Sequence, residues 1–479
     1  MKIPDFVLKT TEKLKKSGFE AYIVGGCVRD FLMLHEPKDW DITTNARPEE
    51  IVNIFTDSKY NNSFGTVLLP IRKENDELEA VLEITTYRSE SAYSDKRHPD
   101  RIEFEDKLEK DLSRRDFTIN ALAIDPEFPE EVVDLFGGRK DIKQKIIRAI
   151  GEPSDRFKED ALRMLRAVRF SSQLDFVLEP KTQRAIVKLA GSLKFVSNER
   201  IRDELIKILA SPKPAEGIEL LHNTKLLQYI IPELEQGVTV KQDRHHIYPV
   251  FKHNLLALKY CPSSSWQVRL AALLHDVAKP KTRKVINNIA TFYNHEYLGA
   301  KMVDKIMTRL KFSSEDRERV VNLVKNHMFY YNVGEVTAAS VRRLIAKVGK
   351  DNLADLIDLR VADRLGSGTP KAMPYKLRHL QYMMEKVQHD PVSVKMLKIS
   401  GDDLIERLNL EPGPKIGAIL DVLLSEVIEE PEKNDKDSLL KRSQQLNKLN
   451  LEELRAKARE VIEEERQKED KSIKKQFKV

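Results

Sequence analysis

The sequence changes character once, at about residue 145, and this change limits the folds open to the chain. Before it, apolar runs of strand length alternate with helical segments; the runs cover residues 21–24, 39–43, 66–71 and 81–87. After it, periodic segments have helical spacing only, as in residues 155–172, 181–190, 198–209 and 215–223. We therefore expect an α+β N-terminal domain followed by all-α domains.

A chain of 479 residues is too long for one core, since domains usually hold ~100–200 residues. Proline-rich and polar stretches at residues 212–214 and 236–244 read as linkers. We divide the chain into a head (1–145), a helical neck (146–235), a histidine-rich helical body (236–375) and a helical tail (376–479). The last ~30 residues are almost continuously charged, which is typical of a solvated helix.

Composition excludes some classes of protein. No apolar run reaches the ~20 residues of a membrane span, and the N-terminus lacks the pattern of a signal peptide. The only cysteines, Cys27 and Cys261, cannot form a disulfide framework, which favours the reducing cytoplasm. The net charge of +6 permits a polyanionic partner without requiring one.

The head carries two acidic residues at strand spacing, Asp39 and Asp41, on either side of Trp40. On a strand, residues i and i+2 point to one face, so both carboxylates converge while Trp40 turns into the core. Magnesium suits such a pair, because it takes hard oxygen ligands from carboxylates and substrate phosphates. The alternative is a strand end with two solvated acids.

Upstream of this pair, Gly25 and Gly26 form a glycine turn between a strand and a helix. Such a turn lets backbone amides approach a phosphate, and Arg29 can add a charge-assisted hydrogen bond. The alternative is an ordinary tight turn. Glu83, on a nearby strand, is either a third metal ligand or an edge-strand charge.

The sequence Gly25-Gly26-x-Val28-Arg29-Asp30, followed by the Asp39–Asp41 pair, resembles the polymerase-β-like nucleotidyltransferases. Within them it is similar to the class II tRNA nucleotidyltransferases and the bacterial poly(A) polymerases. Residues 111–123 match the family's second motif, and residues 134–138 with Asp141 match its hinge between head and neck. The resemblance places Arg114 and Arg115 near the nucleotide and its phosphates.

In the neck, polar residues recur every three positions along an expected helix: Asp160, Arg163, Arg166 and Arg169. The commoner meaning of this stripe is a salt-bridged helix face. In the class II family, the residues matching Asp160 and Arg163 pair with the incoming base in place of a nucleic-acid template. The resemblance therefore implies selection of CTP and ATP, with all four residues in a nucleotide-binding surface. Residues 197–205 match the last neck motif, which supports the template helix.

Residues 91–100, between the fourth strand and the Arg114–Arg115 motif, resemble the flexible loop of enzymes that add the full CCA sequence. Enzymes that stop after CC are described as lacking it. The family usually has glycine where Lys96 stands.

The body carries histidines and aspartates in the order H…HD…H…H…D, which resembles the HD-superfamily metal phosphohydrolases. The residues are His253, His275, Asp276, His295, His327 and Asp363. Histidine and carboxylate ligands suit first-row transition metals as well as magnesium. The alternative is a set of packed polar residues in a helical scaffold kept for RNA docking.

Together, these resemblances imply an enzyme that adds CCA to the 3′ end of tRNA from CTP and ATP, with two Mg²⁺ ions in the head. They cover residues 1 to about 440 and leave the charged tail outside. The rivals are a poly(A) polymerase, an enzyme adding only CC or only A, and an HD phosphohydrolase whose head merely binds RNA. The sequence gives no oligomeric state.

Overall fold

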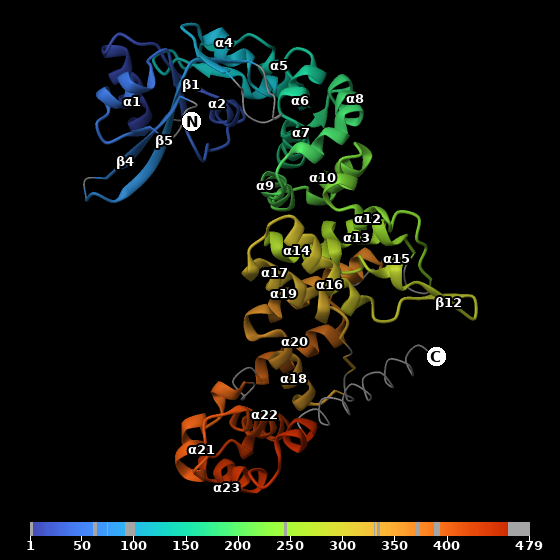
Figure 1. Cartoon of the computed structure of the whole chain (residues 1–479). Coiled ribbons are helices and arrows are strands. Elements are labelled where there is room, and N and C mark those ends of the chain that lie inside the picture. The colour runs from blue at the N-terminus through green and yellow to red at the C-terminus, as the bar shows by residue number, and fades with distance from the viewer. Residues whose placement is uncertain are drawn as a thin grey trace. The chain divides into compact units, whose positions relative to one another are not determined.

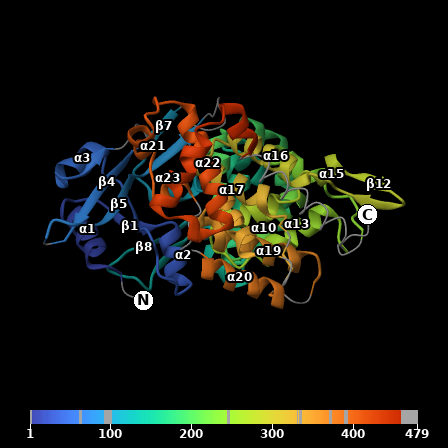
Figure 2. The same cartoon turned by 90° about the horizontal axis from the view of Figure 1, so that it is seen from below.

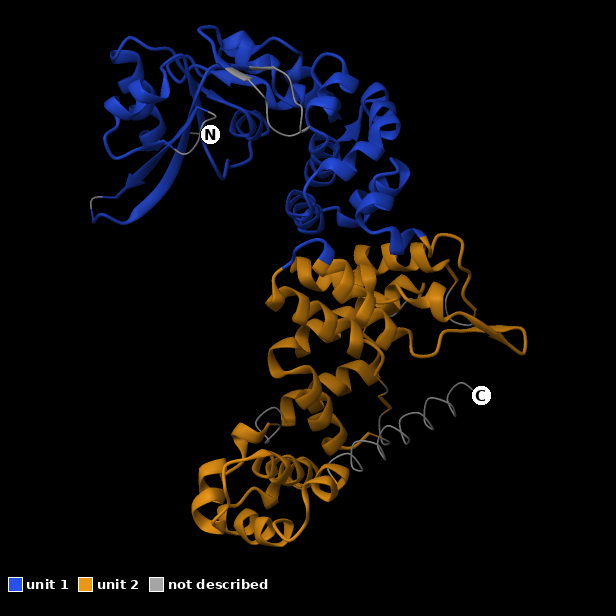
Figure 3. Ribbon diagram, viewed as in Figure 1, with its two compact units in different colours: residues 1–235, 309–312 blue, residues 236–308, 313–479 orange. Residues whose placement is uncertain are grey.

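The structure is a computed structural model that describes residues 3–60, 65–73, 75–91, 101–243, 247–329, 331–332, 336–369, 373–387 and 393–457. Two compact units make up the chain (Figure 3). Unit 1 holds Met1–Glu235 and Arg309–Phe312, and unit 2 holds Gln236–Thr308 and Ser313–Val479. Within the described residues, no helix combines the length and the apolar character that crossing a membrane requires.

A seven-stranded sheet forms the centre of the head, in the order β3-β4-β5-β2-β1-β8-β9. Figure 2 labels β4, β5, β1 and β8 of this sheet, in which β2 lies between β5 and β1. All neighbours are antiparallel except β2 and β5, which run parallel. The strands are β1 (Ala21–Val24), β2 (Asp41–Thr44), β3 (Lys59–Tyr60), β4 (Thr66–Arg72), β5 (Leu78–Thr86), β8 (Leu122–Ile124) and β9 (Val132–Asp134).

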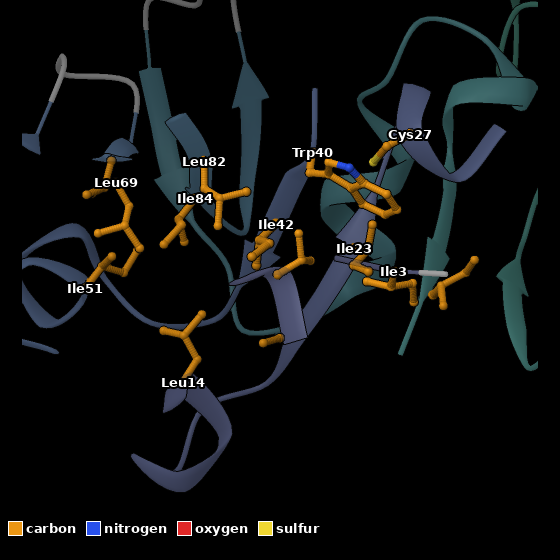
Figure 4. Close-up of a cluster of buried hydrophobic side chains, with 14 of the residues drawn as sticks. Ile3, Leu14, Ile23, Cys27, Trp40, Ile42, Ile51, Leu69, Leu82 and Ile84 are labelled. Carbon is orange, nitrogen blue, oxygen red and sulfur yellow. The ribbon is translucent and has the colours of Figure 1, made fainter. Parts of the chain in front are cut away.

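One side of this sheet is the hydrophobic core of the head (Figure 4). Ile23, Ile42 and Ile84 come from three adjacent strands and are at most 1% exposed. Trp40 is buried, as predicted. Because side chains alternate along a strand, burial of Ile42 and Ile84 leaves Asp41 and Glu83 on the opposite side.

The four predicted strands are confirmed, but the sheet is larger than the sequence indicated. Strands β8 and β9 have three residues each, too short for a detectable alternation. The second strand also begins later than predicted, because β2 starts at Asp41 and Asp39 lies in a bend before it. The other elements of the head and hinge are α1 (Asp5–Lys16), α2 (Gly26–Leu32), α3 (Pro48–Ile54), β6 (Arg88–Ser91), β7 (Arg101–Phe104), α4 (Leu108–Ser113), η1 (Thr118–Asn120) and α5 (Gly138–Gln144).

The neck is helical, but one predicted helix is wrong. Residues 155–172 form two helices that are separated at Asp160, whose backbone is extended with φ −139° and ψ 108°. The expectation of helices only is also wrong, since β10 (Ile146–Ile147) pairs with β11 (Val177–Leu178). The neck helices are α6 (Pro153–Glu159), α7 (Leu162–Leu174), α8 (Pro180–Leu189), η2 (Ala190–Phe195), α9 (Asn198–Leu209), α10 (Pro214–Asn223), α11 (Leu227–Ile230) and α12 (Pro232–Glu235).

Unit 2 begins with the helices that carry the histidines and continues into a separate group of helices, α21 to α23, which lie together in Figure 1 around their own apolar core. A hairpin of β12 (Lys284–Ile286) and β13 (Ile289–Thr291) interrupts the predicted all-helical body. The predicted turn at residues 411–414 joins α21 to α22. The charged end, residues 458–479, lies outside the described residues.

The helices of unit 2 are α13 (Val250–Lys259), α14 (Trp266–Leu274), α15 (Lys279–Thr282), α16 (His295–Arg309), α17 (Ser314–Asn326), α18 (Ala338–Val348), η3 (Lys350–Asn352), α19 (Leu353–Gly366), α20 (Tyr375–Val387), η4 (Val394–Met396), α21 (Gly401–Leu408), α22 (Pro414–Glu429), η5 (Pro431–Lys433) and α23 (Lys436–Leu446).

Candidate active site

The glycine turn of the head lies directly against an arginine and a carboxylate. Gly25 has φ +89°, a conformation that side chains disfavour. A Cβ atom at Gly25 would lie 3.0 Å from Arg115 Nη1 and 3.5 Å from Asp41 Oδ2. The turn therefore brings the backbone, the Arg115 guanidinium and the Asp41 carboxylate to one point, as a site for a phosphate and a cation requires.

Three carboxylates gather on the open side of the sheet. Asp41 faces Glu83 across the parallel ladder, and Glu83 and Asp39 are both exposed. Burial raises the pKa of Asp41 to about 6, and Glu83 and Asp39 act in the same direction while Arg115 opposes them. Glu83 is not an edge-strand charge, because β5 lies between β4 and β2. Carboxylates that lie this close together fit a divalent cation between them.

Arg29, predicted to contact a phosphate, is buried and engaged elsewhere. Its guanidinium donates hydrogen bonds to Asp30 Oδ1 at 2.9 Å and to Asn120 Oδ1 at 2.7 Å. It also lies close to Gly26, where an added Cβ would be 3.6 Å from Arg29 Nη2. In this conformation Arg29 packs against the glycine turn.

Arg114 and Arg115 are held by a residue to which the sequence analysis gave no role. Asp111 is fully buried and accepts hydrogen bonds from Arg114 at 2.6 Å and from Arg115 at 3.2 Å. Burial by itself would raise the pKa of Asp111, but the two guanidinium groups hold it below its usual value. The spacing of Asp111 from the two arginines, three and four residues along a helix, was the available signal.

Asp160 and Arg163 do not pair with each other. Asp160 accepts from Arg200 at 2.6 Å and from the Leu162 backbone N–H at 3.0 Å. The latter bond is to the first residue of α7, a local side-chain-to-backbone contact that competes with helix continuation and accompanies the break at Asp160. Arg163 donates to Glu159 at 2.6 Å and to the Arg114 carbonyl oxygen at 3.2 Å. The sequence analysis identified neither Glu159 nor Arg200 as a partner.

Arg166 and Arg169 are paired with carboxylates inside unit 1. Arg166 Nε donates to Asp116 Oδ2 at 2.7 Å, and Arg169 Nη1 donates to Glu204 Oε1 at 2.9 Å. Burial lowers the pKa of Arg169 to about 10, and the Arg166 charge acts in the same direction. The structure therefore gives both arginines a packing role, and their nucleotide contact stays a prediction.

The ion pair of buried Asp116 with Arg166 yields a prediction about stability. Burial opposes ionisation of Asp116, but Arg166 and Asn120 lower its pKa to about 2. A folded-state pKa below the unfolded value stabilises the protein above pH ~4, and the contribution is lost as pH falls toward about 2. We expect Asp116→Asn to lower the free energy of unfolding by about 2 kcal/mol at pH 7. Denaturant titrations at pH 7, 5 and 3 measure this difference, which should be equal at pH 7 and 5 and smaller at pH 3.

The control for this prediction is Asp155→Asn, which changes an exposed carboxylate on α6. It should leave the free energy of unfolding nearly unchanged. An Asp116→Asn variant as stable as the parent at pH 7 would show that the pair contributes nothing.

In unit 2, the predicted HD residues come together as a buried cluster. His253 Nε2 lies 3.0 Å from His275 Nε2 and 3.2 Å from Asp276 Oδ2. His295 Nε2 lies 3.2 Å from Asp276 Oδ1 and 3.3 Å from His327 Nε2. Asp276 therefore presents one oxygen to each of two histidine pairs.

The sixth residue of the series, Asp363, lies 3.3 Å from His253 Nε2 through its Oδ1 atom. The rings of three histidines are oriented by their backbone. The Nδ1 atoms of His275, His295 and His327 lie 2.7–2.8 Å from the carbonyl oxygens of Ala272, Phe292 and Val324. In the neutral ring, this contact places the proton on Nδ1 as the donor. The lone pair of Nε2 then faces the cluster. The donor set fits a divalent metal ion.

Comparison with known proteins matches the domains that hold both groups of residues. Residues 21–148 match the Poly A polymerase head domain, residues 175–237 the probable RNA and SrmB-binding site of polymerase A, and residues 254–368 the HD domain. The chain is 34% identical to the CCA-adding enzyme of Ligilactobacillus salivarius over 93% of this chain and 98% of that protein. It is 37% identical to the A-adding tRNA nucleotidyltransferase of Deinococcus radiodurans over 66% of this chain and 74% of that protein.

Among solved structures, the chain is similar to the Bacillus stearothermophilus CCA-adding enzyme in complex with CTP. The TM-score is 0.66 at 26% identity, covering 94% of this chain and 98% of that one. The head, the neck and the HD domain together define a nucleotidyltransferase. More narrowly, the chain belongs to the class II CCA-adding tRNA nucleotidyltransferase and poly(A) polymerase family. Enzymes of this family use divalent metal ions.

Proposed function

We propose that this chain adds CCA to the 3′ end of tRNA from CTP and ATP, without a nucleic-acid template. One observation carries the proposal. Arg163, the expected base-selecting arginine, donates to the Arg114 carbonyl oxygen at 3.2 Å, so the neck touches the phosphate-binding motif of the head. A nucleotide with its phosphates at Arg115 would have its base close to Asp160 and Arg163.

In this proposal, Asp39, Asp41 and Glu83 hold two Mg²⁺ ions, which when bound would activate the RNA 3′-hydroxyl and neutralise the leaving pyrophosphate. The Gly25 turn approaches the triphosphate with backbone amides, and Arg114 and Arg115 add charge-assisted hydrogen bonds. Asp111 keeps both guanidinium groups in place when no nucleotide is bound. The clustered carboxylates and the high pKa of Asp41 support the metal assignment.

The neck selects the base through the different chemistry of two side chains. A carboxylate only accepts hydrogen bonds, so Asp160 suits the amino group of cytosine or adenine. An arginine only donates, so Arg163 suits a ring nitrogen or a carbonyl. Uracil would present a carbonyl to Asp160, and guanine a ring N–H to Arg163. A nucleotide must displace Arg200 from Asp160 and Glu159 from Arg163, or bind beside these pairs.

Incorporation of labelled nucleotides into a tRNA that lacks its last three residues tests this proposal. CTP and ATP should be incorporated, and UTP and GTP should be rejected. No transfer of any nucleotide would contradict it. The relatives include an A-adding enzyme, so addition of A alone is the nearest alternative. The loop at residues 92–100, which bears on this choice, lies outside the described residues.

We also infer that the chain divides into four domains, with boundaries at residues 145, 235 and 375.

We further infer a cytoplasmic location. The two cysteines, Cys27 and Cys261, are free and buried, which supports a reducing compartment.

A second candidate function rests on the buried cluster in unit 2. We propose that His253, His275, Asp276, His295, His327 and Asp363 bind a transition metal and hydrolyse a phosphoester, such as a 2′,3′-cyclic phosphate. The orientation of three rings through their Nδ1 atoms supports this over a scaffold role.

We therefore expect phosphoester hydrolysis by the wild type with manganese, nickel or cobalt, and its loss in His275→Ala, because that ring offers Nε2 to the cluster. Asp39→Ala is the matched control, since it alters only the head and should hydrolyse normally. Absence of hydrolysis above background with every metal would favour the scaffold.

A further inference from the structure

A pocket of 510 Å³ lies beside the HD cluster in unit 2. It is lined by Arg360 and Arg364 of α19 and by Pro374, Tyr375, Lys376 and Leu377 at the start of α20. Its volume falls within the range that binds small ligands. Neither the nucleotidyltransferase chemistry nor the six HD residues assign it a role.

One side chain of the pocket is hydrogen-bonded to the cluster. Arg360 Nη1 donates to Asp363 Oδ2 at 2.8 Å, while Asp363 Oδ1 faces His253 at 3.3 Å. Arg360 is also held over the Phe329 ring at 5.7 Å. Arg360, Asp363 and Arg364 are three and four residues apart on α19, so they occupy one face of that helix. A ligand in the pocket would therefore lie next to the cluster.

The positive charge of the pocket is only partly balanced. Arg360 is paired with Asp363, which also acts electrostatically on Arg364, and the buried Arg364 Nε has no hydrogen-bond partner among the described residues. The first turn of α20 contains no acidic residue, and Lys376 adds another cation there. Because a helix start carries partial positive charge, these features together favour an anion, and a phosphate suits a guanidinium best.

The pocket also offers an aromatic surface. Tyr375 is 63% exposed although it lines the pocket, and its ring lies 5.9 Å from the His379 ring behind it. An exposed tyrosine beside an arginine is a combination that binds nucleotides, with the base stacked on the ring and the phosphate on the cation. Inorganic phosphate alone would leave most of this volume empty.

We propose that this pocket binds a nucleoside phosphate, with Arg364 at the phosphate and Tyr375 stacked on the base. As a substrate site it rests on the proposed phosphohydrolase function, and it names the substrate class as a nucleotide ester rather than a simple phosphoester. The same chemistry occurs in a free mononucleotide and at the 3′ end of an RNA.

Calorimetric titration of the full chain with AMP, without added metal, tests the proposal. Titrations are repeated in an Asp160→Ala background to remove base recognition by the head. We expect Tyr375→Ala to weaken AMP binding at least fivefold, from loss of stacking at ~1–3 kcal/mol. Arg364→Gln should weaken it about tenfold or more. Two matched controls on α20, Tyr382→Ala and Arg378→Gln, change exposed residues outside the pocket lining and should bind normally.

Equal AMP binding by the wild type and both pocket variants, with unchanged melting curves, would overturn the proposal. So would inorganic phosphate binding as tightly as AMP, since stacking would then contribute nothing. A trinucleotide with a 3′-phosphate that binds more tightly than AMP, through the same two residues, identifies an RNA end as the source. If the variants lose AMP binding but the wild type hydrolyses nothing with any metal, the phosphohydrolase fails and the pocket stands.

Discussion

Asp41→Ala should reduce nucleotide transfer at least about a thousandfold while tRNA still binds. A metal ion supplies several kcal/mol of charge stabilisation in the transition state, and about 4 kcal/mol corresponds to a thousandfold in rate. Asp41 is the most buried of the three head carboxylates and is adjacent to both Gly25 and Glu83. Single-turnover transfer rates and a tRNA-binding assay measure the two effects separately. Asp39→Ala should lose transfer in the same way.

The fold should survive the Asp41 substitution, because burial and two neighbouring carboxylates already disfavour the charged form of Asp41. The melting temperature of Asp41→Asn should be equal to that of the parent or higher. Glu79→Ala is the matched control, since Glu79 is an exposed carboxylate on the same strand as Glu83. Near-normal transfer by the Asp41 variant would refute the two-metal assignment.

Asp160→Ala should change the selectivity between nucleotides more than the rate of transfer with CTP and ATP. Loss of the acceptor for the exocyclic amino group removes a discrimination of ~1–3 kcal/mol, so rejection of UTP should weaken roughly tenfold to a hundredfold. Arg163→Ala should relax the rejection of GTP and weaken CTP and ATP together. Single-turnover rates with each of the four nucleotides measure both changes.

The contacts of Asp160 also define a competing explanation for its role. Asp160 is bound to Arg200 and to the backbone N–H of Leu162 at the start of α7, which is what a purely structural role requires. That explanation predicts a lower melting temperature and equal losses with all four nucleotides. Asp155→Ala, an exposed carboxylate on α6, provides the control. An Asp160 variant that loses stability but keeps its preference for C and A over U would rule out base selection by this residue.

Local pattern was enough to predict the elements that hold the head site. Apolar runs of strand length identified β1 and β4, and the spacing of Asp39, Trp40 and Asp41 placed the tryptophan in the core correctly. The HD residues, which are spread over positions 253–363, were found through their resemblance to the HD superfamily, and the structure brings all six together. Short-range spacing specifies the head features, so one sequence contains them.

Features that depend on distant residues could not be predicted. The break at Asp160 comes with a bond to Arg200, forty residues away on α9. Glu204 reaches Arg169 from the same helix, which makes an apparent surface stripe into a buried pair. Helical periodicity contains no information on such partners, because it describes one segment at a time.

The order and length of nucleotide addition test the central claim most directly. The substrate is a tRNA that ends before its CCA, and the products are resolved at single-nucleotide length. We expect two residues added from CTP alone, none from ATP alone, and three from both together, after which addition stops. A long run of A from ATP would identify a poly(A) polymerase, and a single A added only to a tRNA already ending in CC would identify an A-adding enzyme. Either result would contradict CCA addition by this chain.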